Sequence, residues 1–204
     1  VAERVAGHAI QQSQHLDSRP SVTVRGFPFL TQLASGSYDE IDVTAKGLVV
    51  GSSLRTLRIA KVTVHLHGVH ISDGFTHVKA DTATADAVIA YADLAKTVGA
   101  TVKYAGAGRV EASAGVTVLG VALRGSVSAR PELTSNAELR FADAKVGALG
   151  VQAPASFESL LSGIFATPIP LAALPFGLTF TGLTATSAGI DVQLTGHGLS
   201  YAGS

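Results

Sequence analysis

Three histidines, His65, His67 and His70, are the residues whose types and spacing come closest to a metal site. On a β-strand, side chains two positions apart project from the same face, so the first two would lie side by side. An extra residue inserted at Gly68 would turn the third onto that face as well. Three imidazoles can hold zinc and leave a position open for water. The alternative is a polar outer face that happens to carry histidine, since the acidic Asp73 that follows lies in a Ser-Asp-Gly turn.

Two pairs of carboxylates have spacings that general acid–base chemistry could use. They are Asp81 with Asp86 and Glu40 with Asp42. Both pairs lie in segments where polar and apolar residues alternate, which is typical of a strand with one solvated face. A solvated face therefore accounts for them without catalysis.

Motifs for nucleophilic, nucleotide or metal chemistry are absent from the sequence. It contains no G-x-S-x-G, no P-loop, no G-x-G-x-x-G and no H-E-x-x-H. The run Gly106-Ala107-Gly108 has no third glycine and precedes a strand pattern, which indicates a turn. The absence of Cys excludes disulfides, thiolate metal sites and thiol nucleophiles. We expect no enzymatic activity and no cofactor.

Composition restricts the classes of partner. The chain has 204 residues, with 15 Lys+Arg and 15 Asp+Glu, and so no excess of positive charge to neutralise phosphates. A nucleic-acid partner is therefore not expected. Hydrophobic residues make up 47% and charged residues 15%, against about 25% charged in an ordinary domain. This surplus indicates either an apolar surface beyond the core or a sparsely charged β protein.

Hydrophobic periodicity predicts three helices in positions far apart along the chain. Residues 1–16 are amphipathic and are followed by Pro20, which ends a helix. A short helix is expected over 91–98, with Gly99 at its C-terminal cap. The third helix spans 156–165, where apolar residues recur with helical spacing: Phe157, Leu160, Leu161, Ile164 and Phe165.

Most of the remaining chain alternates like β-strands. Residues 22–24 and 41–45 fit this pattern, 76–89 has an ambiguous pattern and is expected to be a strand, and strands return over 101–149. In 54–72 the apolar parity changes twice, which predicts bulges near Ala60-Lys61 and at Gly68 in one long, curved strand.

Two further segments bear on the question of a second apolar surface. Residues 116–123 are apolar at both parities, as expected for a strand buried on both faces. The chain closes with a hairpin of 176–180 and 190–194 around a turn at 187–189. No repeat and no linker divides the sequence, so we expect one domain over 1–204.

The longest uncharged stretch, residues 159–190, is not a membrane span, because its prolines break a helix and its second half alternates like a strand. It contains the apolar, proline-rich connector 166–176. One interpretation is an inner helix and a central strand. The other is a surface in contact with lipid, because a loop normally lies at the surface and an apolar one needs an apolar neighbour. The run Phe27-Pro28-Phe29-Leu30 has the same two interpretations, a plug for the core or the lip of a lipid entrance.

Several motifs in this order resemble the actinobacterial LmeA-like phospholipid-binding family. The resemblance is carried by the run Val22-Thr23-Val24-Arg25-Gly26-Phe27-Pro28-Phe29-Leu30-Thr31-Gln32 with Gly36 and Tyr38, by Ala90-Tyr91-Ala92-Asp93-Leu94 and by Leu174-Pro175-Phe176-Gly177-Leu178. The first run is the most specific, and together the motifs span nearly the whole chain.

The resemblance implies an α+β fold in which a long, curved antiparallel sheet wraps around two or three helices, as in tubular lipid-binding domains, and leaves an apolar groove. It also implies a phospholipid partner, peripheral contact with a membrane, and export to the periplasm or cell envelope with a role in envelope lipid or lipoglycan assembly. The sequence has no Met, so we expect any export signal or anchor to lie upstream. We expect a monomer.

The residues expected to line the lipid site are chosen for apolarity alone. They are Phe27, Phe29, Leu30, Phe157, Leu161, Phe165, Leu171, Leu174, Phe176, Leu178 and Phe180. An Asp at Leu171 or Leu174 is expected to weaken lipid binding with little loss of stability if the connector faces lipid, and to unfold the protein if it is core.

Three hypotheses follow. The first is a non-enzymatic phospholipid carrier, the second a structural or adhesive β protein whose apolar faces pack only on each other, and the third a zinc enzyme using the histidine group.

Overall fold

The computed structural model of the chain describes residues 20–26, 32, 34–52, 55–72, 77–118, 121–147, 155–171 and 178–202. These residues form eleven strands and two α-helices, α3 (Tyr91–Val98) and α4 (Ala155–Ile164). Strand outweighs helix, as predicted. The helix expected over 1–16 lies outside the described residues, and so do Phe27, Phe29, Leu30, Leu174 and Phe176. In the described part of the chain, no helix has the length and hydropathy needed to cross a membrane.

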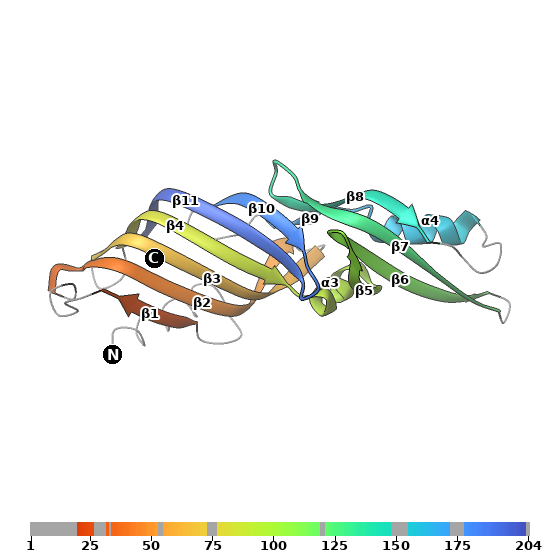
Figure 1. Cartoon of the computed structure of the whole chain (residues 1–204), viewed down its shortest axis with the longest axis horizontal. Helices are drawn as coiled ribbons and strands as arrows, with labels where there is room; N and C mark the ends of the chain where they lie inside the picture. The colour runs from red at the N-terminus through yellow and green to blue at the C-terminus, as the bar shows by residue number, and fades with distance from the viewer. Residues whose placement is uncertain are drawn as a thin grey trace.

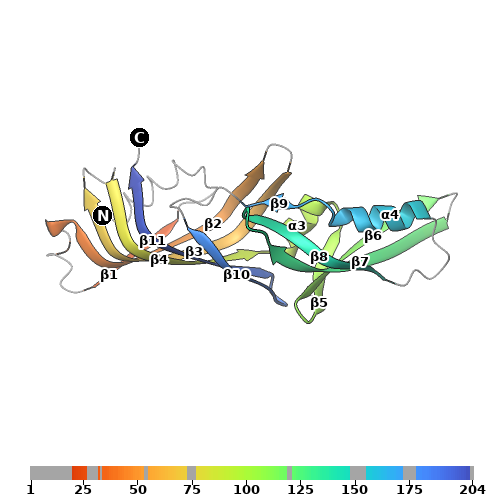
Figure 2. The same cartoon turned by 90° about the horizontal axis from the view of Figure 1, so that it is seen from above.

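The strands are divided between two antiparallel sheets, where the sequence suggested one. Figure 1 shows the two sheets end to end along the long axis of the molecule. The first sheet has the order β1-β2-β3-β4-β11-β10. Its strands are β1 (Ser21–Arg25), β2 (Ser37–Ser52), β3 (Arg55–Ser72), β4 (His77–Ile89), β10 (Thr179–Ala185) and β11 (Ile190–Ala202). Its long strands bend, as predicted, and Figure 2 shows the sheet curling.

The second sheet has the order β5-β6-β7-β8-β9. Its strands are β5 (Thr101–Gly106), β6 (Arg109–Val118), β7 (Val121–Leu133), β8 (Glu138–Val146) and β9 (Ile169–Pro170). The helix α4 lies on this sheet, and the ring of Phe165 directly after it stacks on Phe141 of β8 with centroids 4.3 Å apart.

The short helix α3 joins the two sheets. It ends as predicted at Gly99, which has φ +72° and donates its N–H to the carbonyl of Ala95. The hydroxyl of Tyr91 donates to the carbonyl of Thr186 at 2.5 Å, between β10 and β11. This contact fixes the helix to the first sheet, and burial raises the pKa of Tyr91 to about 12.

The main core also spans both sheets. Its fully buried members come from both sheets and both helices and include Leu57, Ile89, Leu94, Val110, Val127, Leu139, Leu161, Ile190 and Leu194. One continuous core therefore holds the two sheets together.

The apolar run 116–123 is a hairpin and not a single strand. Val116 pairs with Leu123 and Val118 with Val121, so residues 119–120 connect β6 to β7. The two parities of the run belong to two strands that pair with each other. The argument that this segment needs apolar material on both faces is therefore wrong.

The parity changes predicted in 54–72 occur, but not through bulges. Buried positions on β3 move from Leu57 and Ile59 to Val62, and again to Val69 beyond Gly68. The register of β3 with both of its neighbours is nevertheless unbroken, so no residue is inserted. The neighbouring strands change parity at the same level, which removes the need for an extra residue.

The second change forms a crease across four strands. The row Asp39, Gly68, Asp81 and Gly198 lies opposite in register on β2, β3, β4 and β11, and these positions are left out of the pairing ladder. Gly68 has φ +61° and Gly198 has φ +59°, a backbone conformation that glycine adopts without strain. The crease bends the sheet while its register is preserved.

Candidate functional site

Four of the residues expected to line a lipid site are buried in the main core. Phe157, Leu161, Phe165 and Leu171 have exposed fractions of 4%, 0%, 3% and 2%. Leu171 follows β9, whose Ile169 is also fully buried and pairs with β8. The described part of the connector 166–176 is thus packed against the second sheet. Leu171→Asp is therefore expected to unfold the protein, so this variant cannot be used to test lipid binding.

Leu178 and Phe180 are only partly buried and pack against the main core. Phe180 of β10 pairs with Leu194 of β11. Leu178 contacts both the main core and a second apolar cluster on the first sheet. A Cβ at Gly196 would lie 3.0 Å from Leu178 Cδ2, so glycine makes room for this side chain.

The second cluster covers one face of the first sheet, which we call the apolar face. Its buried members are Tyr38, Ile41, Val69, Ala80, Ala83 and Leu199, and its partly buried members include Val22, Val24, Val43, Val64, Leu66, Ile71 and Val78. The alternation in the sequence predicts this face, but apart from Leu178 none of its residues is among those named for the lipid site. Alternation shows that a strand has an apolar side, and it does not show what that side contacts.

The apolar face is ordered across the sheet by side-chain size. One cross-strand row runs Val24, Ile41, Leu66, Ala83 and Gly196. A second runs Val22, Val43, Val64, Ala85, Leu194 and Phe180. Large side chains thus lie on β1 to β3, and small ones on β4. These alanines of β4 are themselves buried, with exposed fractions of 5% for Ala80, 1% for Ala83 and 2% for Ala85.

Two shallow depressions in the described part of the chain lie elsewhere. One, of about 610 Å³, is lined by residues of α3 and β5, including Lys96 and Val102. The other, of about 460 Å³, is lined by residues of β5 to β7, including Glu111 and Arg124. No residue expected to bind lipid lines either depression. The apolar groove stays a prediction.

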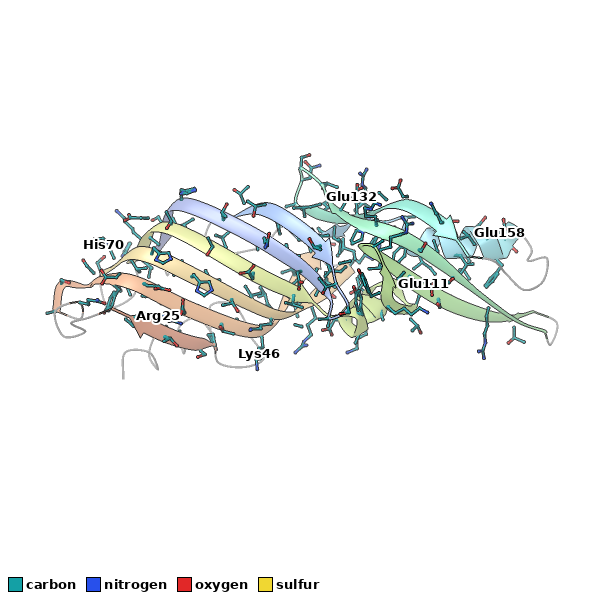
Figure 3. The ribbon with its side chains drawn as sticks, in the orientation of Figure 1. Arg25, Lys46, His70, Glu111, Glu132 and Glu158 are labelled. Atoms are coloured by element: carbon teal, nitrogen blue, oxygen red, sulfur yellow. The ribbon has the colours of Figure 1, made fainter. Side chains whose placement is uncertain are left out.

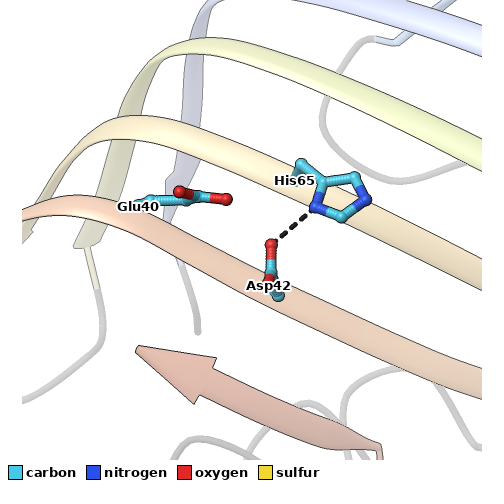
Figure 4. A group of neighbouring side chains, drawn as sticks. All are labelled: Glu40, Asp42 and His65. Carbon is cyan, nitrogen blue, oxygen red and sulfur yellow. Dashed lines mark hydrogen bonds and ion pairs between the residues drawn. The ribbon is translucent and has the colours of Figure 1, made fainter. Parts of the chain in front are cut away.

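The opposite face of the first sheet carries a cluster of polar side chains from three strands. Arg25 Nε of β1 donates to Asp42 Oδ2 of β2 at 2.5 Å, and it lies 3.9 Å from Glu40 Oε1. His65 Nδ1 of β3 lies 2.6 Å from Asp42 Oδ1 (Figure 4). Because an ionised carboxylate only accepts hydrogen bonds, the Nδ1 atom carries the proton.

The electrostatics of this cluster depend on Asp42, which is 8% exposed. Burial raises the pKa of the Asp42 carboxyl, but hydrogen bonds from His65 and Arg25, together with their charges, outweigh burial and lower the pKa overall. The guanidinium thus neutralises the carboxylate and fixes the edge strand β1 to its neighbours.

Among the described residues, the group whose possible ligand atoms lie within 4.8 Å of one another is Glu40, Asp42 and His65. Neither His67 nor His70 belongs to it, although both are exposed on the face predicted for them. Arg25 already supplies positive charge to these carboxylates, so we assign the cluster to holding β1. The other polar residues labelled in Figure 3 are spread over both sheets and helix α4, along the length of the molecule.

Comparison with known proteins gives one match. A family model described as LmeA-like phospholipid-binding matches residues 1–195. No curated protein and no solved structure matches the chain.

Proposed function

The chain belongs to the LmeA-like phospholipid-binding family, and from this premise we propose that it is a non-enzymatic phospholipid carrier of the cell envelope. We propose further that the acyl chains lie on the apolar face of the first sheet. The supporting observation is a continuous cluster of apolar side chains on one side of that sheet, which come from β1, β2, β3, β4 and β11.

Hydrophobic burial alone supplies enough free energy for this function. Each buried CH2 contributes about 0.8 kcal/mol, so a 16-carbon chain gives roughly 10 kcal/mol before the cost of ordering it. Affinity therefore requires no catalytic group or metal ion. Polar groups at the end of the apolar face would decide which head group is taken.

Export to the periplasm, peripheral contact with the membrane during loading, and a monomeric state complete the proposal. Together they describe a protein that receives, presents or transfers lipid in envelope lipid or lipoglycan assembly. The balance of 15 basic and 15 acidic residues supports a partner that is not a nucleic acid.

The second candidate function is a structural or adhesive β protein without a ligand. It is favoured by one observation, that Phe157, Leu161 and Phe165 pack in the core of their own chain. Under this hypothesis the apolar face of the first sheet is covered only by other parts of the same protein.

Lipid extraction followed by mass spectrometry separates the two functions. Protein purified from a bacterial host is expected to carry, or to take up from vesicles, a two-chain phospholipid. Absence of lipid after purification, together with no uptake from zwitterionic or anionic vesicles, would leave the structural function ahead.

A matched pair of variants tests the location of the lipid. Leu66 and His67 are neighbours on β3, one on the apolar face and the other exposed on the opposite face. Leu66→Gln is expected to reduce phospholipid uptake at least several-fold, whereas His67→Gln leaves it unchanged, with circular dichroism confirming that both variants fold. Equal uptake by the two variants would exclude the apolar face as the site.

A further inference from the structure

Gln32 carries a buried polar atom that has no hydrogen-bond partner among the described residues. The residue lies in a helical turn before β2 and is 7% exposed. Its amide Nε2 donates to Asp39 Oδ2 at 3.0 Å. Its carbonyl Oε1 is buried without a hydrogen-bond partner in the part of the chain that the structure describes. A buried acceptor of this kind costs free energy until a donor reaches it.

The orientation of the amide follows from its partner. An ionised carboxylate accepts hydrogen bonds and cannot donate them, so the nitrogen of Gln32 must face Asp39 and the oxygen must face away. Gly26 makes this placement possible, because a Cβ there would lie 2.2 Å from Gln32 Nε2. The backbone of Gly26 has φ +119°, which also favours glycine.

The partner of this amide lies at one end of the first sheet. Asp39, its partner, is in the crease near the beginning of β2, at the end of the first sheet farther from the second (Figure 1). The preceding residue, Tyr38, is buried on the apolar face. Asp39 itself is exposed on the other side of β2, so the polar end of an amphiphile with its chains on the apolar face would meet it by passing round the end of the sheet.

The charges around the Gln32 amide favour a ligand that donates hydrogen bonds. Among the described residues, no cation forms an ion pair with Asp39, because the guanidinium of Arg25 is directed to Asp42 and Glu40. The corner thus offers one neutral carbonyl and one carboxylate, which are both acceptors.

We propose that Gln32 Oε1 and Asp39 form a subsite for a phospholipid head group that donates hydrogen bonds through an ammonium or a hydroxyl group. This inference rests on the proposed function, which supplies the phospholipid. A head group whose nitrogen is fully methylated has no N–H to donate and leaves the acceptor unpaired.

The test compares lipids that share acyl chains and differ in the head group. Vesicle uptake is measured for phosphatidylethanolamine, phosphatidylglycerol and phosphatidylcholine. The wild-type protein is expected to take up one or both of the first two about tenfold more readily than phosphatidylcholine, which has no donor in its head group. Gln32→Leu is expected to bring this ratio close to one and to leave uptake of phosphatidylcholine unchanged.

Two further variants complete the design. Gln193→Leu, on an exposed position of β11, is the matched control and should keep the wild-type ratio. Asp39→Asn distinguishes the two donors, because removing the negative charge lowers the preference for the ammonium lipid and leaves that for the hydroxyl lipid.

Failure of this inference differs from failure of the proposed function. Equal uptake of all three lipids by the wild-type protein overturns the subsite and leaves the carrier function intact, whereas no uptake of any lipid overturns both. If Gln32→Leu does not fold, the wild-type ratio and Asp39→Asn decide the question. A donor-lipid ratio near one in the wild type, or a preference for the ammonium lipid that Asp39→Asn leaves unchanged, then overturns the subsite.

Discussion

Asp42 joins three strands through its side chain. Arg25 comes from the edge strand β1, and His65 from β3 on the other side of β2. Since β1 pairs over only five residues, this side-chain network adds to a short ladder. Because Arg25 is the last residue of this edge strand, the network also holds the next residue, Gly26, beside the Gln32 amide.

The lowered pKa of Asp42 predicts how stability depends on pH. A carboxyl whose pKa is lower in the folded than in the unfolded state stabilises the protein above the unfolded value of about 3.9. That contribution is lost as the pH falls through the folded pKa. Asp42→Asn is therefore expected to lower the free energy of unfolding by about 1 kcal/mol at pH 7. The effect is small because Arg25 and His65 are partly exposed and screened by water. Below about pH 4 the cost should shrink progressively, because the wild-type carboxyl becomes protonated.

Urea unfolding of wild type and variant across this pH range provides the measurement. Asp86→Asn, an exposed carboxylate on β4, is the matched control and should show little difference at any pH. A cost that is the same at pH 7 and at pH 3 would contradict an electrostatic role for Asp42.

At the scale of the strands, two glycines of the crease that share a backbone conformation allow a comparison. Gly68 and Gly198 both have positive φ, and an alanine there costs about 1–2 kcal/mol. At Gly68 the new Cβ would also lie 2.2 Å from Asp81 Oδ2, whereas at Gly198 it meets nothing within 4 Å. Gly68→Ala should therefore destabilise the protein more than Gly198→Ala.

Thermal unfolding of a double-mutant cycle tests the cause. In the Asp81→Ala background the extra cost of Gly68→Ala should largely disappear, because the obstructing carboxylate is gone. Equal costs at the two glycines would show that Asp81 moves aside freely.

A contrast is expected between an apolar position of helix α4 and the apolar residue directly after it. Phe165 is 3% exposed and stacks on Phe141, whereas Leu160 is 48% exposed. Phe165→Ala is expected to cost about 3–5 kcal/mol in urea unfolding, and Leu160→Ala less than about 1 kcal/mol. If Phe165→Ala instead kept its stability and lost lipid uptake, the helix would be a wall of the lipid site.

Local sequence patterns could predict many of these helices and strands, but they could not predict which strands pair with each other. Alternation located β1 and part of β2, and the cap at Gly99 located the end of α3, because both signals act over a few residues. The hairpin at 119–120 and the division into two sheets depend on which strands pair, which is a property of distant segments.

The candidate site shows a second limit of sequence. The stripe of Phe157, Leu161 and Phe165 has the same pattern whether its neighbour is a protein core or an acyl chain. In the structure these side chains face the second sheet, and the apolar face lies on the first. The unpaired carbonyl of Gln32 could not be foreseen either, because satisfaction of a polar atom is visible only when all its neighbours are placed.

At the scale of the whole molecule, the two sheets divide the work of stability and of binding. The main core joins both sheets and both helices, so it sets the global free energy of unfolding. The apolar face lies on the part of the first sheet that extends away from this core, and its partly buried side chains outnumber its buried ones. We expect that part to open more readily than the core in the lipid-free protein.

Hydrogen exchange with and without lipid tests this division. A ligand at 100 times its dissociation constant stabilises the state that binds it by about 2.7 kcal/mol, so amides that exchange only after the lipid is released should slow about 100-fold. We expect this slowing in β1, the first half of β2 and the second half of β3, which carry Val24, Ile41 and Leu66 of the apolar face. Amides of β5 and β6 should exchange at unchanged rates. If lipid instead slowed exchange in α4 and β6 to β8 alone, the lipid would lie on the second sheet, and the apolar face of the first would be an ordinary core surface.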